Sequence, residues 1–171
     1  MHNDIAHFAG TTLLRDLREQ VEAAAGIAKA AHVLVDAGLT GKGVAIANDV
    51  DEPIHDAEAL LGLVTVVAQS AEATRDSAPD DSGRDAHATE TEEAAGAPID
   101  DTLADAAIRA FLAQADARLH AAVGVARAAE ICVAAGKLGD GVRIALDIEA
   151  LLYDARHLVN TASIVRRTTT T

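Results

Sequence analysis

The sequence predicts an all-α protein: a four-helix bundle made of two tandemly duplicated antiparallel helical hairpins, joined by a long crossover. Half of the 171 residues are apolar, yet there are only two Phe, one Tyr and no Trp. Ala and Leu supply much of that apolar half and favour helix, and no useful length of chain alternates apolar and polar residues as a strand does. The chain also matches itself when it is shifted by 98 residues, which indicates an internal repeat.

The internal repeat is clearest between residues 21–50 and 119–148, where fifteen of thirty aligned positions are identical. A bias toward alanine raises such a count, but it does not explain glycines that return in register. Four glycines have a counterpart 98 residues later: Gly26, Gly38, Gly41 and Gly43 match Gly124, Gly136, Gly139 and Gly141. We therefore interpret the chain as a tandem duplication.

Each copy is expected to form one hairpin, residues 1–70 the first and residues 102–171 the second, and the two are expected to pack as a single domain. In each hairpin a first helix leads to a glycine turn and a second helix leads away from it. Gly38 and Gly136 fit the left-handed position that follows the last helical residue. The first helices are expected to end at Ala37 and Ala135, and the second to run from Val44 to near Ser70 and from Val142 to near Arg167.

Short polar side chains mark the predicted helix starts. Asn3 and Asp101 stand at equivalent positions, and either is a good N-cap. In the second copy, Thr102 and Asp105 have the spacing of a capping box.

Pro53 interrupts the second helix of the first copy. Proline lacks the backbone donor of other residues and its ring clashes with the preceding turn. The sequence therefore predicts a kink at Pro53, or a helix that begins properly only at Asp51 or Glu52.

Residues 71–101 connect the two hairpins and carry most of the excess negative charge. They hold ten acidic residues against Arg75 and Arg84, and they include two of the three prolines. They contain too few large apolar residues to join a core. This composition predicts a disordered or loosely ordered acidic linker.

The first helix of each hairpin is expected to be buried on two sides. A bulky stripe in the second copy consists of Ile108, Leu112, Leu119, Ala122, Ala126, Ala129 and Val133. A stripe of small residues lies roughly opposite, with Ala110, Ala117, Ala121, Gly124 and Ala128 in the second copy and Ala23, Gly26, Ala30 and Ala37 in the first. Glycine within a helix costs about 1 kcal/mol relative to alanine. Gly26 and Gly124 therefore predict close packing of another helix, from the other hairpin or from another subunit.

The second helix of the first copy ends in a segment that is apolar nearly all round. Residues 60–67 read LLGLVTVV. A helix with no polar face is usually buried on all sides, and four helices alone bury such a segment poorly. The segment predicts a homo-oligomer or a partner protein, with cover by the linker as the alternative.

The turn sequence GLTGKG, residues 38–43, has three glycines and a lysine, as a phosphate-binding loop does. A P-loop, however, follows a strand and has a serine or threonine after its lysine, and this sequence lacks both. The second copy reads GKLGDG, with Asp140 in the place of Lys42. An acid in the place of the cation argues against phosphate, so the glycines are interpreted as turn residues that set the backbone conformation.

The composition argues against two classes of partner. A net charge of −13 repels a phosphate backbone and aromatic stacking platforms are missing, so no nucleic acid is expected. The longest apolar run, residues 59–68, is too short to cross a bilayer, and no Lys/Arg clusters flank the apolar faces, so no membrane partner is expected. The N-terminus lacks a signal-peptide pattern and the single Cys132 cannot form an internal disulfide. We therefore expect a cytoplasmic protein.

Histidines and carboxylates raise the alternative of a metal site. Two hairpins joined by a long crossover is the topology of ferritin-like carboxylate bundles, which carry Glu-x-x-His motifs. Glu52 and His55 have this spacing, and Asp154 and His157 come close to it. His120 is expected to lie level with His157. The motif is not shared by the two copies, so the pattern favours solvated helix faces, with His120, Asp154 and His157 as alternative metal ligands.

No arrangement for nucleophilic catalysis is evident, because no serine has the context of a nucleophile elbow and adjacent carboxylates do not share a helix face. We therefore expect a non-enzymatic helical-bundle scaffold or protein-interaction module, without a cofactor, that binds itself or another helical protein. One alternative is a metal-binding bundle that stores metal or acts as an oxidoreductase. The other is a carrier of an apolar small ligand held between helices. The bias toward Ala, Val, Asp and Arg suggests a bacterial source.

Overall fold

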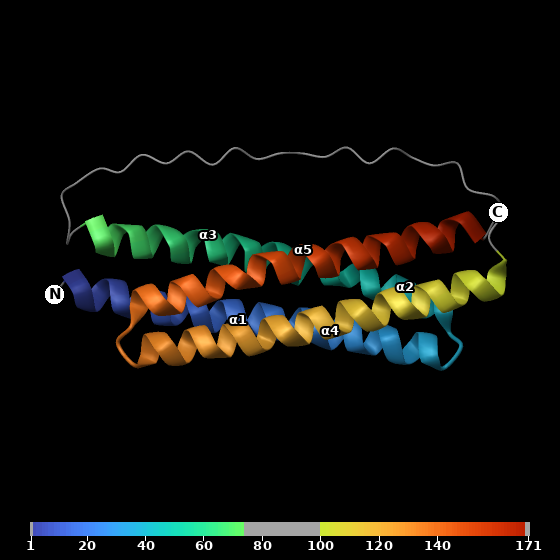
Figure 1. The fold of residues 1–171 in the computed structure, drawn as a ribbon, viewed down its shortest axis with the longest axis horizontal. Helices are drawn as coiled ribbons and strands as arrows, with labels where there is room; N and C mark the ends of the chain where they lie inside the picture. Colours follow the sequence, from blue (N-terminus) through green and yellow to red (C-terminus); the bar gives the residue numbers. More distant parts are fainter. Residues whose placement is uncertain (1, 74–99, 170–171) are drawn as a thin grey trace.

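The computed structural model of the chain describes residues 2–73 and 100–169. The regular structure of these residues is entirely helical, which confirms the all-α prediction (Figure 1). The α-helices are α1 (His2–Asp36), α2 (Thr40–Ala47), α3 (Asp51–Ala73), α4 (Asp101–Ala134) and α5 (Leu138–Thr169), and a 3-10 helix, Asn48–Val50, joins α2 to α3. Within the described ranges, no helix combines the length and the apolar character that a membrane span requires.

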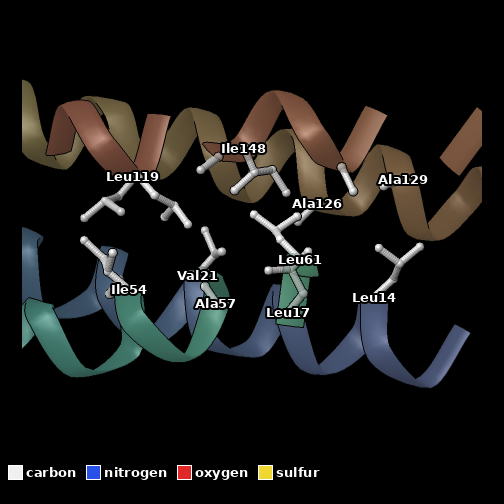
Figure 2. Packing of buried hydrophobic residues seen from close by; sticks show 14 of the residues in the cluster. Leu14, Leu17, Val21, Ile54, Ala57, Leu61, Leu119, Ala126, Ala129 and Ile148 are labelled. Atoms are coloured by element: carbon white, nitrogen blue, oxygen red, sulfur yellow. The ribbon is translucent and has the colours of Figure 1, made fainter. Parts of the chain in front are cut away.

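The long helices lie side by side along one axis (Figure 1). α1 packs on α3 and α4, and α5 packs on α4 and α3, while α1 and α5 barely touch. α1 and α4 run in opposite directions, because Arg18 contacts Glu130 whereas Asp36, later in α1, contacts Arg109, earlier in α4. Figure 2 shows α1 and α3 forming one layer and α4 and α5 the other, with side chains of both layers pointing into the space between them.

The core is a seam of buried residues that follow one another along each long helix at alternating intervals of three and four residues. In α1 these residues are Leu14, Leu17, Val21, Ala24, Ala28, Ala31 and Val35. Such spacing keeps one stripe of a helix against its neighbours, as in a coiled coil. The bulky stripe predicted for the second copy is confirmed, since every residue in it is buried.

The buried positions of the two halves correspond. Most buried residues of the first half have a counterpart 98 positions later that is also buried. Examples are Leu14 with Leu112, Val21 with Leu119, Val35 with Val133, Val50 with Ile148 and Ala57 with Ala155. One cluster of buried residues draws members from α1, α3, α4 and α5, so the two halves share a core.

Both first helices end in the way that the sequence predicts. Gly38 has a φ of 79° and Gly136 a φ of 81°, a left-handed conformation that favours glycine. The Gly38 amide donates to the Val35 carbonyl, and the Leu39 amide donates to the Leu34 carbonyl. The second turn has the same two hydrogen bonds, so each turn is a Schellman cap.

The last glycine of each turn lets the second helix cross closely over the first. A Cβ added to Gly43 would lie 2.8 Å from the Ala31 carbonyl oxygen, and one added to Gly141 would lie 2.8 Å from the Ala129 carbonyl oxygen. Backbone oxygens within a helix cannot move aside easily. The absence of a side chain is therefore required at these two positions.

The second helix of each hairpin begins four residues earlier than predicted, at Thr40 in α2 and at Leu138 in α5. Gly41 and Gly139 therefore lie in the first turn of a helix and not in the loop before it. The loops are short because the Schellman cap alone reverses the chain.

The two predicted N-caps are wrong. α1 begins at His2, so Asn3 lies inside it. α4 begins at Asp101 and is capped by Asp100, whose carboxylate accepts a hydrogen bond from the Thr102 amide at 3.4 Å. The predicted capping box is therefore not formed. Several short polar residues follow one another here, and residue type alone does not select among them.

Pro53 lies in the first turn of α3, which begins at Asp51 as one of the two predictions states. In the first turn of a helix the missing donor of proline leaves no hydrogen bond unmade. The second copy has Leu151 at this position, and α5 runs through without a break.

The segment between the hairpins is shorter than the predicted linker at both ends, because α3 continues to Ala73 and Asp100 caps α4. The prediction of disorder for the rest of residues 71–101 lies outside the described residues. The end of α3 and the start of α4 lie at opposite ends of the bundle (Figure 1).

Candidate functional site

The residues of the alternative metal site do not converge. His120 lies against Asp116, with 2.8 Å between Nδ1 and Oδ1. Asp154 pairs with Arg118 at 3.6 Å, and His157 is exposed. In the part of the chain that the structure describes, no group of three or more His, Cys, Asp or Glu side chains is placed to hold a metal ion. The structure therefore does not bring together His120, Asp154 and His157, the alternative metal ligands.

Gly26 and Gly124 are exposed, and no described helix of this chain packs against them. A Cβ added to either glycine would meet no atom within 4 Å. The prediction of close packing is therefore wrong within the chain, because the small-residue stripes of α1 and α4 point away from the core seam. Packing of another subunit against these stripes stays a prediction.

Large apolar side chains are exposed at matching positions of the two halves. Val33 on α1 is 57% exposed, and its counterpart Ile131 on α4 is 69% exposed. Two more such pairs are Ile5 with Leu103 and Val66 with Ile164. Both hairpins therefore present the same apolar positions to the outside.

The apolar end of α3 is buried on one side only. Leu61 and Val64 belong to the core, whereas Leu63 and Val66 are exposed. The other helices of the chain thus leave one side of this segment uncovered within the described residues. The prediction that a partner or a second copy covers it stays open.

A line of ionisable side chains follows the contact between α1 and α4. Arg18 lies 3.1 Å from Glu130, and His32 lies 3.5 Å from Asp116. The two contacts use the same pair of repeat positions with acid and base exchanged, because Asp116 is the counterpart of Arg18 and Glu130 is the counterpart of His32. These side chains are engaged with each other across the helix contact, which assigns them to packing between the hairpins.

A groove of about 710 Å³ lies between α3 and α5. Its volume falls in the range of roughly 300–1,000 Å³ that is usual for ligand pockets. The lining consists of Glu58, Leu61, Gly62 and Thr65 from α3 and of Leu146, Glu149, Ala150, Tyr153 and Asp154 from α5. The groove thus combines an apolar surface with three carboxylates.

One end of the contact between α3 and α5 is closed by polar bonds. The Ser163 hydroxyl donates to the side-chain oxygen of Asn48 at 2.7 Å. Close by, Arg156 lies 3.5 Å from Asp51. The hydroxyl–amide bond joins α5 to the 3-10 helix that precedes α3, and the ion pair joins α5 to the first turn of α3. Together they close this end of the contact.

The other end is open because the equivalent residues cannot form these bonds. Thr65 and Leu146 stand where the closed end has its hydrogen bond, and a leucine side chain has no acceptor. The Thr65 hydroxyl donates instead to the Leu61 carbonyl at 2.9 Å. Glu58 and Glu149 stand where the closed end has its ion pair, and two carboxylates repel each other. The groove lies at this open end.

No protein-family model, curated protein or solved structure matches this chain. Its function is therefore inferred from its own surface and from the groove between α3 and α5.

Sequence patterns did not predict the groove, because its residues come from two segments far apart in the sequence and share no motif. The signal that points to it is a difference between residues that lie 98 positions apart. Where the first copy has a polar residue, the groove side of α5 carries an apolar one in three places: Leu146 for Asn48, Ala150 for Glu52 and Tyr153 for His55.

Proposed function

We propose that the chain is a non-enzymatic helical-bundle module that binds itself or another helical protein. The observation that carries the proposal is the repetition of exposed apolar side chains, above all Val33 on α1 and Ile131 on α4. A single exposed apolar residue needs no explanation. The same position exposed in both halves gives the surface two equivalent apolar contacts, and equivalent contacts suit a symmetric assembly or a partner with two matching sites.

The small residues beside these side chains support a helical partner. Gly26 lies one heptad before Val33 on α1, and Gly124 lies one heptad before Ile131 on α4. Since these glycines have no side chain and no contact with other helices within residues 2–73 and 100–169, the backbone of a second helix can approach closely. A helix of another chain can pack its backbone against the small residue and its apolar side chains against the large one.

The finer architecture is part of the same proposal. We propose that the chain arose by duplication of one hairpin, and that residues 1–70 and 102–171 are two copies that form one domain. The correspondence of buried positions 98 residues apart supports this. If it holds, the two halves expressed as separate chains associate into a complex with the helicity of the intact chain. Two halves that stay apart at high concentration argue against it.

Native mass spectrometry of the purified chain, together with elemental analysis, tests the proposed function. The expected result is a defined oligomer, or a stoichiometric complex with a helical partner, without stoichiometric metal. A chain that remains monomeric and partner-free at every concentration would contradict the proposal. So would stoichiometric iron, manganese or zinc that is lost in His157→Ala.

The groove supports a second candidate, a carrier of an apolar small ligand. Leu61, Leu146 and Tyr153 give its lining apolar surface. An organic molecule that is released on denaturation, and that Leu146→Asn no longer retains, would favour the carrier over the interaction module. Extraction and mass spectrometry of the purified chain distinguish the two.

A further inference from the structure

The groove between α3 and α5 is apolar where the repeat would make it polar. Leu146 and Tyr153 are exposed, although their counterparts in the first copy are Asn48 and His55. Exposed leucine and tyrosine side chains beside a hollow leave apolar area in contact with water. Covering that area with apolar side chains of a ligand releases the water and favours binding.

The charge of the groove is one-sided. Glu58, Glu149 and Asp154 are in the lining, and no Lys, Arg or His is among its residues. Glu58 pairs with Arg156 and Asp154 pairs with Arg118, but Glu149 forms no ion pair with any residue that the structure describes. Together with a net charge of −13, this lining complements a positively charged ligand.

The dimensions suit a short helix. On α5 the lining runs from Leu146 to Asp154, which is about 12 Å of helix at roughly 1.5 Å per residue. On α3 it runs from Glu58 to Thr65, about 10 Å by the same measure. Both lengths correspond to about two helical turns. Tyr153 is 68% exposed, so the groove is open along its side and admits a rod better than it encloses a small molecule.

We propose that this groove docks a short, positively charged amphipathic helix of a partner protein. The apolar stripe of that helix packs on the exposed Leu146 and Tyr153, and a Lys or Arg side chain beside the stripe reaches Glu149. This is the helix-in-groove mode of recognition. The inference rests on the proposed function, because it names the site and the chemistry of one partner of the interaction module.

Two designed helical peptides, titrated into the full-length chain, test the proposal. They share one Leu/Ala stripe and differ only in their flanks, which carry Lys in one peptide and Glu in the other. Fluorescence anisotropy is expected to give an affinity about tenfold higher for the Lys peptide, and added salt should reduce that difference. Amide chemical shifts are expected to change around Leu61, Glu149 and Tyr153.

Variants that give the groove the residues of the first copy provide a matched control. The double variant Leu146→Asn/Tyr153→His is expected to weaken the Lys peptide about tenfold, because it removes the apolar surface and gives Thr65 an acceptor. Asn48→Leu changes the closed end and should leave the affinity unchanged. Glu149→Lys should reverse the preference between the two peptides, a result that loss of folding cannot produce.

Three outcomes would overturn the proposal: equal affinity for the two peptides, shift changes confined to the outer faces of α1 and α4, or binding of dodecyltrimethylammonium in the groove without binding of either peptide. The second outcome would place the binding site on α1 and α4 and would still agree with the proposed function as an interaction module. The proposed function itself fails only if neither peptide binds anywhere and the chain neither self-associates nor holds a partner in native mass spectrometry.

Discussion

Glu58 on α3 and Arg156 on α5 lie 98 residues apart, which is the offset of the internal sequence match, and they bind each other at 3.2 Å. The contact lies at the middle of the α3–α5 seam, between its closed end and its open groove. In an assembly of two identical hairpins, the residue at this position of one hairpin would face the same residue of the other. The two side chains would then carry equal charges and repel each other. With Glu at position 58 and Arg at position 156, an ion pair stands in the place of that repulsion.

The first prediction concerns this pair. Both side chains are about one-third exposed, at 33% and 31%. Glu58→Arg should therefore lower the free energy of unfolding by about 1 kcal/mol, because a repulsion replaces the attraction. The double variant Glu58→Arg/Arg156→Glu should recover part of the loss, but not all, since a carboxylate at position 156 then lies beside Asp51. Denaturation of the parent chain, the two single variants Glu58→Arg and Arg156→Glu, and the double variant measures the coupling energy between the two side chains. If the effects of the single variants simply add up in the double variant, the two side chains do not interact.

The second prediction concerns the crossing glycines. Gly43→Ala and Gly141→Ala should each lower the free energy of unfolding by about 1–3 kcal/mol, because the new methyl group overlaps a backbone carbonyl of the preceding helix. Urea denaturation of each variant provides the measurement. Stability equal to that of the parent chain would show that the two helices do not cross as closely as described.

The third prediction concerns the exposed glycines Gly26 and Gly124, for which the opposite effect on stability is expected. Gly26→Ala and Gly124→Ala should each raise the free energy of unfolding by about 0.5–1 kcal/mol, because alanine favours helix and its methyl group meets none of the residues that the structure describes. Gly26→Leu extends the test to the assembly. If another helix packs there, this variant loses association while its far-ultraviolet circular dichroism stays the same, and unchanged association would remove Gly26 from the interface.

The fourth prediction concerns the closed end of the α3–α5 seam. Ser163→Ala should lower the free energy of unfolding by about 1 kcal/mol, because the Asn48 side chain, in the 3-10 helix just before α3, loses its donor from α5. Thr65→Ala is the matched control: its hydroxyl binds only a carbonyl of its own helix, so its removal should cost less. Thermal unfolding of both variants makes the comparison, and an equal effect would argue against the closing role of Ser163.

Much of the backbone arrangement was predictable, because it depends on local rules. The bulky stripe that includes Leu112 and Leu119 follows from the spacing of apolar residues. Gly38 and Gly136 follow from the left-handed conformation that ends a helix. Pro53 limits where α3 can begin. Each of these predictions needs only a few neighbouring residues.

The predictions that were wrong depend on distances between helices. Gly26 and Gly43 are both glycines kept in the two copies, yet only Gly43 meets another backbone, and sequence spacing does not reveal which face of α1 is covered. The ligand pattern of His120 and His157 was likewise drawn from register along the helices, whereas the side chains find other neighbours. The groove was missed because it is lined by side chains of two helices that are far apart in the sequence.

The central claim is that the exposed apolar positions shared by the two halves are a binding surface. Sedimentation velocity on the parent chain and on Val33→Glu/Ile131→Glu, over a wide range of concentrations, tests it most directly. Both side chains are exposed, so the variant should keep its helical spectrum and its unfolding midpoint. The account predicts that the parent sediments as an assembly, or as a complex with its partner, and the variant as a monomer. Identical sedimentation of the two chains, at unchanged helicity, would contradict it.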